Sequence, residues 1–264
     1  MKAKIFAAIA VFPFVAACGG GHDDPCKQLT SAGFVPCTPP APSTKVDTSI
    51  PEGIWGGGTS DGLAVSTLVL ETGQYFIVPT STNGIGLVEG MMTGNNGNIS
   101  DPAAVIYPAS NMPVAGTLSG NFSAKKTLTG TVSASAALSS PFPSGATSST
   151  FNGNYNSLYD SPATVAEAVG SWTGRTSGSS VTLTVASDGT FSGANAGCTF
   201  SGNVSPRSTG KHVLDGKVTF NNSACVLGTG ASMTFEAVVS GNQLVGAGVT
   251  QQRDHAFVVV ATKN

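Results

Sequence analysis

Residues 180–191 have the sequence Ser-Val-Thr-Leu-Thr-Val-Ala-Ser-Asp-Gly-Thr-Phe. Val181, Leu183 and Val185 alternate with polar residues, which is the period of a strand with one buried face. Asp188 and Gly189 form a strong hairpin signal, because a type I′ turn needs positive φ at both central residues. The stretch therefore predicts two antiparallel strands joined by a tight turn.

Similar short runs fill the second half of the chain. We expect about eight strands there, near 171–175, 180–186, 189–193, 197–205, 212–220, 231–239, 243–250 and 255–262. Short connections join antiparallel neighbours, so the runs predict a meander. A meander of this length closes into a barrel or folds into a sandwich, because free edges promote aggregation.

The first half of the chain repeats this pattern in five blocks that keep the same order. The matching blocks are 53–56 and 170–174, 69–75 and 185–191, 118–123 and 200–205, 128–132 and 214–218, and 150–151 and 234–235. Trp172 follows Trp55 by 117 residues, whereas Phe200 follows Leu118 by only 82. The first copy therefore carries roughly 34 extra residues between Phe76 and Gly116. It lacks a counterpart of 243–262, and we expect the extra segment to supply replacement strands.

The fold class predicted is all-β, with two tandem antiparallel meander modules, each a small barrel or sandwich of about eight short strands. One short helix is expected at the junction, where Ser161 can cap it, Pro162 suits its first position and Gly170 ends it. The first module spans 52–160 and the second 161–264.

The N-terminus predicts export. Lys2 and Lys4 precede an apolar run at 5–17, which is too short for the roughly 20 residues of a membrane-spanning helix. It ends in Val15-Ala16-Ala17-Cys18, which resembles the lipobox of bacterial lipoproteins. The resemblance implies that 1–17 is a signal peptide and that Cys18 carries a lipid. Cleavage at the same small residues by an ordinary secretory route is the alternative.

Residues 18–51 are predicted to be a lipidated tether, because 38–44 is rich in Pro and prefers an extended path. Four Cys follow Cys18, and an even number in an exported protein indicates disulfides. We expect Cys26 to pair with Cys37 and Cys198 with Cys225. A zinc site is the rival, but no C-x-x-C spacing occurs, so no metal and no cofactor are expected.

Charge excludes one class of partner. The chain has 12 basic and 14 acidic residues, and loss of 1–17 would remove two lysines. The resulting net negative charge argues against nucleic acid as a partner. Gly19 after Cys18 resembles lipoproteins released to the outer membrane, so the expected membrane contact is the lipid itself.

Each copy begins with a G-x-W sequence, at Gly53 to Trp55 and Gly170 to Trp172. With the predicted up-and-down meander, it resembles lipocalins and the lipocalin-like modules of bacterial envelope lipoproteins. That resemblance implies that Trp172 closes the barrel floor and pairs with Arg253. The alternative interpretation is that Trp55 and Trp172 are simple core residues. Gly-rich tandem barrels also resemble surface lipoproteins of Gram-negative bacteria that bind host or nutrient proteins.

No catalytic set is expected. The G-x-S-x-G sequence at 58–62 precedes a strand and not the helix that a nucleophile elbow requires, so we interpret it as a hairpin turn. The alternative is a hydrolase, and its candidate residues are His212 near Asp215 and His255 beside Asp254. Neighbouring strand residues point to opposite faces, which would separate Asp254 from His255.

The sequence therefore predicts an outer-membrane lipoprotein that is a non-catalytic binding module for a small apolar ligand or a protein partner. The alternative is a structural envelope protein whose barrels are filled by side chains and hold no ligand. Orientation towards the periplasm or the cell surface stays open.

Overall fold

The computed structural model describes residues 27–30, 33–36, 49–109 and 112–264. The chain divides into two units, Met1–Lys45 and Val46–Asn264. In the first unit, β1 (Lys27–Thr30) and β2 (Gly33–Pro36) pair as an antiparallel hairpin with Lys27 opposite Pro36. Cys18, Cys26 and Cys37 lie outside the described residues, so the lipid anchor and the first disulfide stay predictions.

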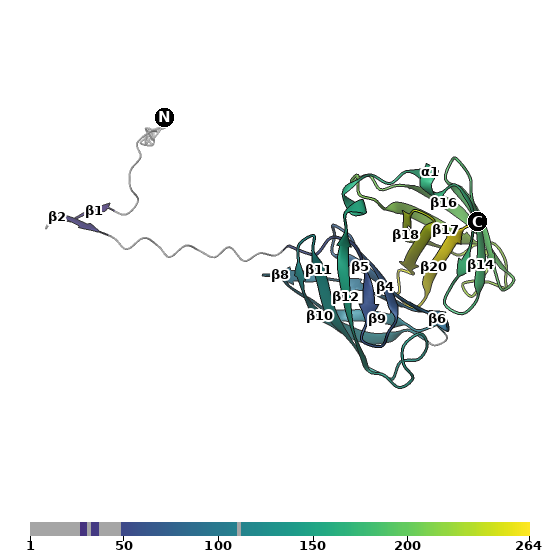
Figure 1. The fold of residues 1–264 in the computed structure, drawn as a ribbon, viewed down its shortest axis with the longest axis horizontal. Coiled ribbons are helices and arrows are strands. Elements are labelled where there is room, and N and C mark those ends of the chain that lie inside the picture. The colour runs from purple at the N-terminus through teal and green to yellow at the C-terminus, as the bar shows by residue number, and fades with distance from the viewer. Residues whose placement is uncertain (1–26, 31–32, 37–48, 110–111) are drawn as a thin grey trace, which may run out of the picture. The chain divides into compact units, whose positions relative to one another are not determined.

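The second unit confirms the predicted fold class, since its described residues form two antiparallel barrels (Figure 1). The first barrel contains β3 (Gly53–Thr59), β4 (Ala64–Val69), β5 (Gln74–Ser81), β7 (Leu87–Met91), β9 (Asn98–Tyr107), β10 (Val114–Ser123), β11 (Thr127–Ala134) and β12 (Ser148–Asn156). It closes where β12 pairs with β3. Two short strands, β6 (Gly84–Ile85) and β8 (Thr93–Asn95), add to β5 and β9.

The second barrel follows the predicted strands closely. It contains β13 (Gly170–Arg175), β14 (Ser180–Val185), β15 (Thr190–Asn195), β16 (Cys198–Pro206), β17 (Leu214–Phe220), β18 (Ser232–Ser240), β19 (Gln243–Val249) and β20 (Ala256–Lys263). Each strand pairs with the next, and β13 pairs with β20 to close the barrel.

The extra segment of the first copy does supply the missing strands, because β7 and β9 lie between Phe76 and Gly116. The repeated blocks therefore occupy different places in the two barrels. β10 to β12 are the last three strands of the first barrel, whereas their counterparts β16 to β18 are followed by β19 and β20.

A cross-strand pair explains why two of the repeated blocks match. Gly130 lies opposite Phe151 in the first barrel, and Gly216 lies opposite Phe235 in the second. A Cβ atom at Gly130 would lie 2.6 Å from the Phe151 ring, and one at Gly216 would lie 2.3 Å from the Phe235 ring. Each glycine thus leaves room for a phenylalanine inside its barrel.

The hairpin at 186–189 is confirmed, but the predicted turn type is wrong. Gly189 has φ +86°, whereas Asp188 is not among the residues with positive φ. The turn is closed by a hydrogen bond from the Gly189 N–H to the Ala186 carbonyl. The first copy has the same turn, with Gly73 at φ +89° bonded to the Leu70 carbonyl.

The junction holds two short helical segments in place of the longer helix predicted. The 3₁₀ helix η1 (Ser157–Asp160) comes first and is followed by α1 (Val165–Ala168). Ser161 ends η1 and does not cap α1. The N-cap of α1 is Thr164, whose backbone N–H donates to Glu167 Oε2 at 3.0 Å. Pro162 therefore lies between the two segments.

Three apolar clusters stabilise the second unit. One fills the first barrel around Trp55 and Tyr75, and another fills the second around Trp172 and Phe235. The third, which we call the interface cluster, joins the outer surfaces of both barrels. Its buried members are Leu68, Leu70, Phe76, Val78, Ile85, Leu87, Tyr107, Tyr159, Val213, Ala247 and Val258. Because these clusters, the barrels and the second disulfide are all internal to Val46–Asn264, this unit is self-contained.

Candidate functional site

A pocket of about 350 Å³ lies at one end of the second barrel, which we call its mouth. The mouth is formed by loops 176–179, 196–197, 221–231 and 250–255. The apolar lining residues include Phe200, Phe220, Leu227 and Phe257, and the polar ones include Ser179, Asn195 and His255. Apolar walls with a few polar groups are typical of small-molecule sites.

The floor of this pocket is the aromatic core of the barrel. Phe200 and Phe235 both contact Phe257, with ring centroids 5.8 and 5.4 Å apart. Below these rings the barrel contains the packed side chains of its core, with a small void of about 30 Å³ among them. A ligand therefore has space at the mouth and not along the barrel axis.

The predicted disulfide between Cys198 and Cys225 is confirmed, and it lies at the rim of the pocket. It ties loop 221–231 to the first residue of β16. Asn222 strengthens the attachment, since its side chain donates to the Gly197 carbonyl at 2.9 Å. The loop is thus held at the side of the mouth.

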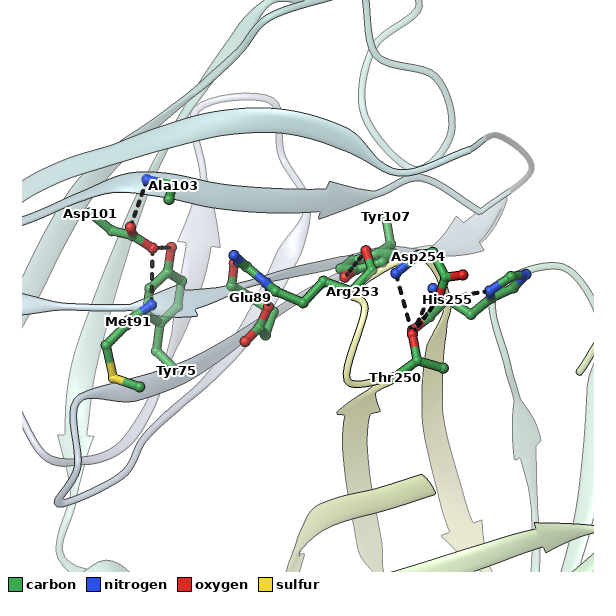
Figure 2. Close-up of polar contacts among 10 residues, drawn as sticks. All are labelled: Tyr75, Glu89, Met91, Asp101, Ala103, Tyr107, Thr250, Arg253, Asp254 and His255. Carbon is green, nitrogen blue, oxygen red and sulfur yellow. Dashed lines mark hydrogen bonds and ion pairs between the residues drawn. The ribbon is translucent and has the colours of Figure 1, made fainter. Parts of the chain in front are cut away.

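Loop 250–255 connects the pocket with the first barrel (Figure 2). Arg253 Nε lies 2.8 Å from Glu89 Oε2, and its Nη2 donates to the Glu89 carbonyl at 3.0 Å. Tyr107 donates its hydroxyl to the Arg253 carbonyl at 2.9 Å. Burial raises the pKa of Tyr107, so this hydroxyl stays protonated and remains a donor.

The other side of the same loop presents His255 to the pocket. Thr250 Oγ1 accepts hydrogen bonds from the N–H groups of Asp254 and His255, both at 3.2 Å. His255 Nδ1 lies 3.1 Å from Asp254 Oδ1. The two residues are therefore close together, contrary to the expectation that they separate, because β20 begins only at Ala256.

The mouth of the first barrel is filled. Loop 135–147 places Leu138 and Phe142 in the core of that barrel, where they are 3% and 5% exposed. Its backbone is fixed from the other side, since the Ala109 N–H donates to the Ser140 carbonyl at 2.7 Å. Side chains of this loop therefore occupy the mouth of the first barrel.

The carboxylate of Asp101 is buried in the first barrel and accepts three hydrogen bonds. Asp101 accepts hydrogen bonds from the Tyr75 hydroxyl at 2.9 Å and from the N–H groups of Met91 and Ala103 at 3.0 and 2.8 Å (Figure 2). Burial and the adjacent Asp101 raise the pKa of Tyr75, which keeps its hydroxyl a donor. Asp101 fixes the irregular pairing of β9 with β10, which is a structural role.

The predicted pairing of Trp172 with Arg253 is not what the structure shows. Trp172 donates to the Ala168 carbonyl at 2.8 Å, and the cation near its ring is Lys263, with Nζ 5.3 Å from the ring centroid. Arg253 lies at the mouth, whereas Trp172 packs against α1 at the other end. Trp55 is a buried core residue in the same manner, donating to the Pro51 carbonyl at 3.0 Å.

His212 contacts Ser161 and Glu167 and not Asp215. It is 2% exposed, with Nε2 3.1 Å from the Val239 carbonyl and 3.4 Å from Glu167 Oε2. The Ser161 hydroxyl donates to the Leu158 carbonyl at 2.9 Å, and its oxygen lies 3.4 Å from His212 Nδ1. This arrangement fastens the junction to the second barrel. At 58–62 the chain makes the expected hairpin turn between β3 and β4.

The interface cluster was not predicted from the sequence, although the sequence contains an indication of it in two runs of consecutive apolar residues. Phe76, Ile77 and Val78 are consecutive buried residues, as are Val258 and Val259. Continuous apolar runs mark strands that are covered on both faces. The runs at 75–78 and 257–260 therefore pointed to packing on the outside of each barrel.

No helix among the described residues is long and apolar enough to cross a membrane. The described part of the chain also contains no group of three or more His, Cys, Asp or Glu residues arranged to hold a metal ion. Searches against protein families, curated proteins and solved structures found no match to this chain.

Proposed function

We propose that this protein is a lipid-anchored envelope protein whose second barrel binds a small, mainly apolar molecule at its mouth. The observation that carries the proposal is the pocket of about 350 Å³, because pockets of ordinary small molecules measure roughly 300–1,000 Å³. The ligand's apolar body packs on Phe200, Phe220 and Phe257, and a polar group on it meets Asn195 or His255.

Fluorescence titration of Val46–Asn264 with 1-anilinonaphthalene-8-sulfonate tests this site. Ala224 lines the pocket and is exposed, so Ala224→Phe should weaken probe binding at least about tenfold by occupying the space. Ala136→Phe is the matched control, since Ala136 is exposed on the corresponding loop of the first barrel and should leave binding unchanged. Equal binding to both variants would contradict the proposal. Native mass spectrometry of protein purified from its host should then show a bound molecule.

A protein partner at the same rim is the second candidate. Val226, next to the disulfide, is 87% exposed, and an exposed apolar side chain on a fixed loop suits a protein contact. A photo-crosslinking amino acid at Val226 in intact cells should capture one defined partner. If it captures none while the pocket binds a small molecule, the partner hypothesis fails.

The anchor is proposed on the sequence at 15–18. Cys18→Ala, or treatment of cells with globomycin, should stop lipoprotein processing and release the protein from the membrane fraction. Unchanged processing and membrane recovery would contradict the anchor. Protease treatment of intact cells distinguishes the two orientations, because only a surface protein is digested.

A further inference from the structure

A second pocket, of about 210 Å³, lies between the outer surfaces of the two barrels. Phe76 and Val78 of β5 and Ile54 and Leu68 of β3 and β4 line one side, and Val238 and Val245 of β18 and β19 line the other. Glu236 of β18 also lines the pocket, together with polar residues of both barrels, Ser66, Thr67, Asn156, Ser240 and Gln243. We propose that this pocket, which we call the interface pocket, binds a small organic ammonium ion through the Glu236 carboxylate.

Glu236 has no cationic partner of its own. No Lys or Arg nitrogen of the described residues lies within 4 Å of its carboxylate, and no side-chain hydrogen bond reaches it within that part of the chain. A partly buried carboxylate without a partner is unfavourable. An ammonium group placed beside it would supply the missing charge.

The nearest arginine is already engaged with two other carboxylates. Arg207 Nη1 lies 2.6 Å from Asp215 Oδ1, and its Nε lies 3.1 Å from Glu71 Oε2. Asp215 is the cross-strand neighbour of Glu236. Glu236 acts on the same guanidinium electrostatically without contacting it. Three carboxylates therefore share one cation, and the local excess of negative charge favours a cationic ligand.

The protonation behaviour of Glu236 agrees with this geometry. Burial raises the pKa of Glu236 to about 7, with Arg207 opposing the rise and Asp215 and Glu89 adding to it. A bound cation would favour the ionised form. The apolar walls meanwhile suit a short hydrocarbon body, so a primary alkylammonium ion matches both parts of the pocket.

Titration of isotope-labelled Val46–Asn264 with n-butylammonium chloride, followed by NMR, tests the site. The amide signals of Phe76, Val238 and Val245 should shift, and the apparent Kd should be about tenfold weaker at pH 6 than at pH 8, as a pKa of about 7 requires. Glu236→Gln should weaken binding by at least tenfold and remove the pH dependence.

The neutral analogue 1-butanol is the control that needs no variant. It should bind wild-type protein more weakly than the ammonium ion at pH 8, and with no pH dependence. Equal affinities for the two compounds, no shifts at the interface pocket, or unchanged butylammonium affinity in Glu236→Gln would each overturn the proposal. Shifts at Phe200 and Phe257 report on the mouth pocket, so the two sites are judged separately.

Discussion

Loops 135–147 and 221–231 follow corresponding blocks of the repeat. The first loop fills the mouth of its barrel, whereas the second leaves a pocket at the mouth of its own. The first loop inserts Leu138 and Phe142 into its barrel. The second is tied to β16 by the Cys198–Cys225 disulfide and leaves a pocket above the aromatic core. One duplicated module thus yields a barrel whose mouth is filled by side chains and a barrel with a pocket at its mouth.

Removing the filling side chain should have the largest effect. Phe142→Ala should lower the free energy of unfolding by about 3 to 5 kcal/mol, because a fully buried ring is lost and a cavity remains. Leu227→Ala, in the corresponding loop of the second barrel, should cost about 1 kcal/mol, since Leu227 is only partly buried. Denaturant unfolding measures both, and equal losses would contradict the contrast.

Loss of the disulfide should affect the second barrel alone. The crosslink joins residues 27 positions apart, and the chain-entropy relation for a loop of that size gives about 3 to 4 kcal/mol of stabilisation. The double variant Cys198→Ser with Cys225→Ser should be destabilised by that amount and should bind the fluorescent probe more weakly. Retained probe affinity would show that the loop needs no crosslink to shape the mouth.

The contact between loop 250–255 and the first barrel tests whether the two barrels depend on each other. Arg253→Ala would leave Glu89, which is 5% exposed, without its cation, and should cost about 2 kcal/mol. Lys125→Ala is the matched control, because the Lys125–Asp160 pair is exposed and should contribute under about 0.5 kcal/mol. Probe binding should weaken in the first variant only, as His255 shifts with its loop.

A pH dependence of stability is also expected at the contact between the barrels. The pKa of Glu236, raised by burial to about 7, exceeds the ordinary value, so the folded state binds more protons than the unfolded state over pH 4.5 to 7. Its contribution is therefore most favourable below about pH 4.5 and is lost as pH rises through about 7. The stability of Glu236→Gln relative to wild type should accordingly increase from pH 5 to pH 8. A constant difference across that range would contradict the assignment.

Most of the second barrel was predictable from sequence because its strands alternate. The alternation of Val181, Leu183 and Val185 with polar residues predicted β14. The pairing of Cys198 with Cys225 was predicted correctly because both residues lie in the same local unit. The first barrel was harder, since its closure depends on inserted strands that have no counterpart in the second copy. The pockets were not predictable, because loop lengths do not reveal that 135–147 fills a barrel and 221–231 does not.

Arg253 shows a second limit of sequence reasoning. Its position just before the last strand favoured a partner in its own barrel, and the lipocalin resemblance supplied Trp172. The observed partner, Glu89, is 164 residues away and belongs to the other barrel. Such a contact can be predicted only when the packing of the two barrels is known. The continuous apolar runs were the one sequence feature that indicated this packing.

The interface cluster has a consequence for how the protein is made. The last strand of the first barrel ends at Asn156, and the partner surfaces on β19 and β20 follow some 90 to 100 residues later in the chain. A first barrel that folds before the second therefore exposes Phe76, Val78 and Leu87 to solvent. A variant that slows folding of the second barrel should lengthen this exposure and increase aggregation.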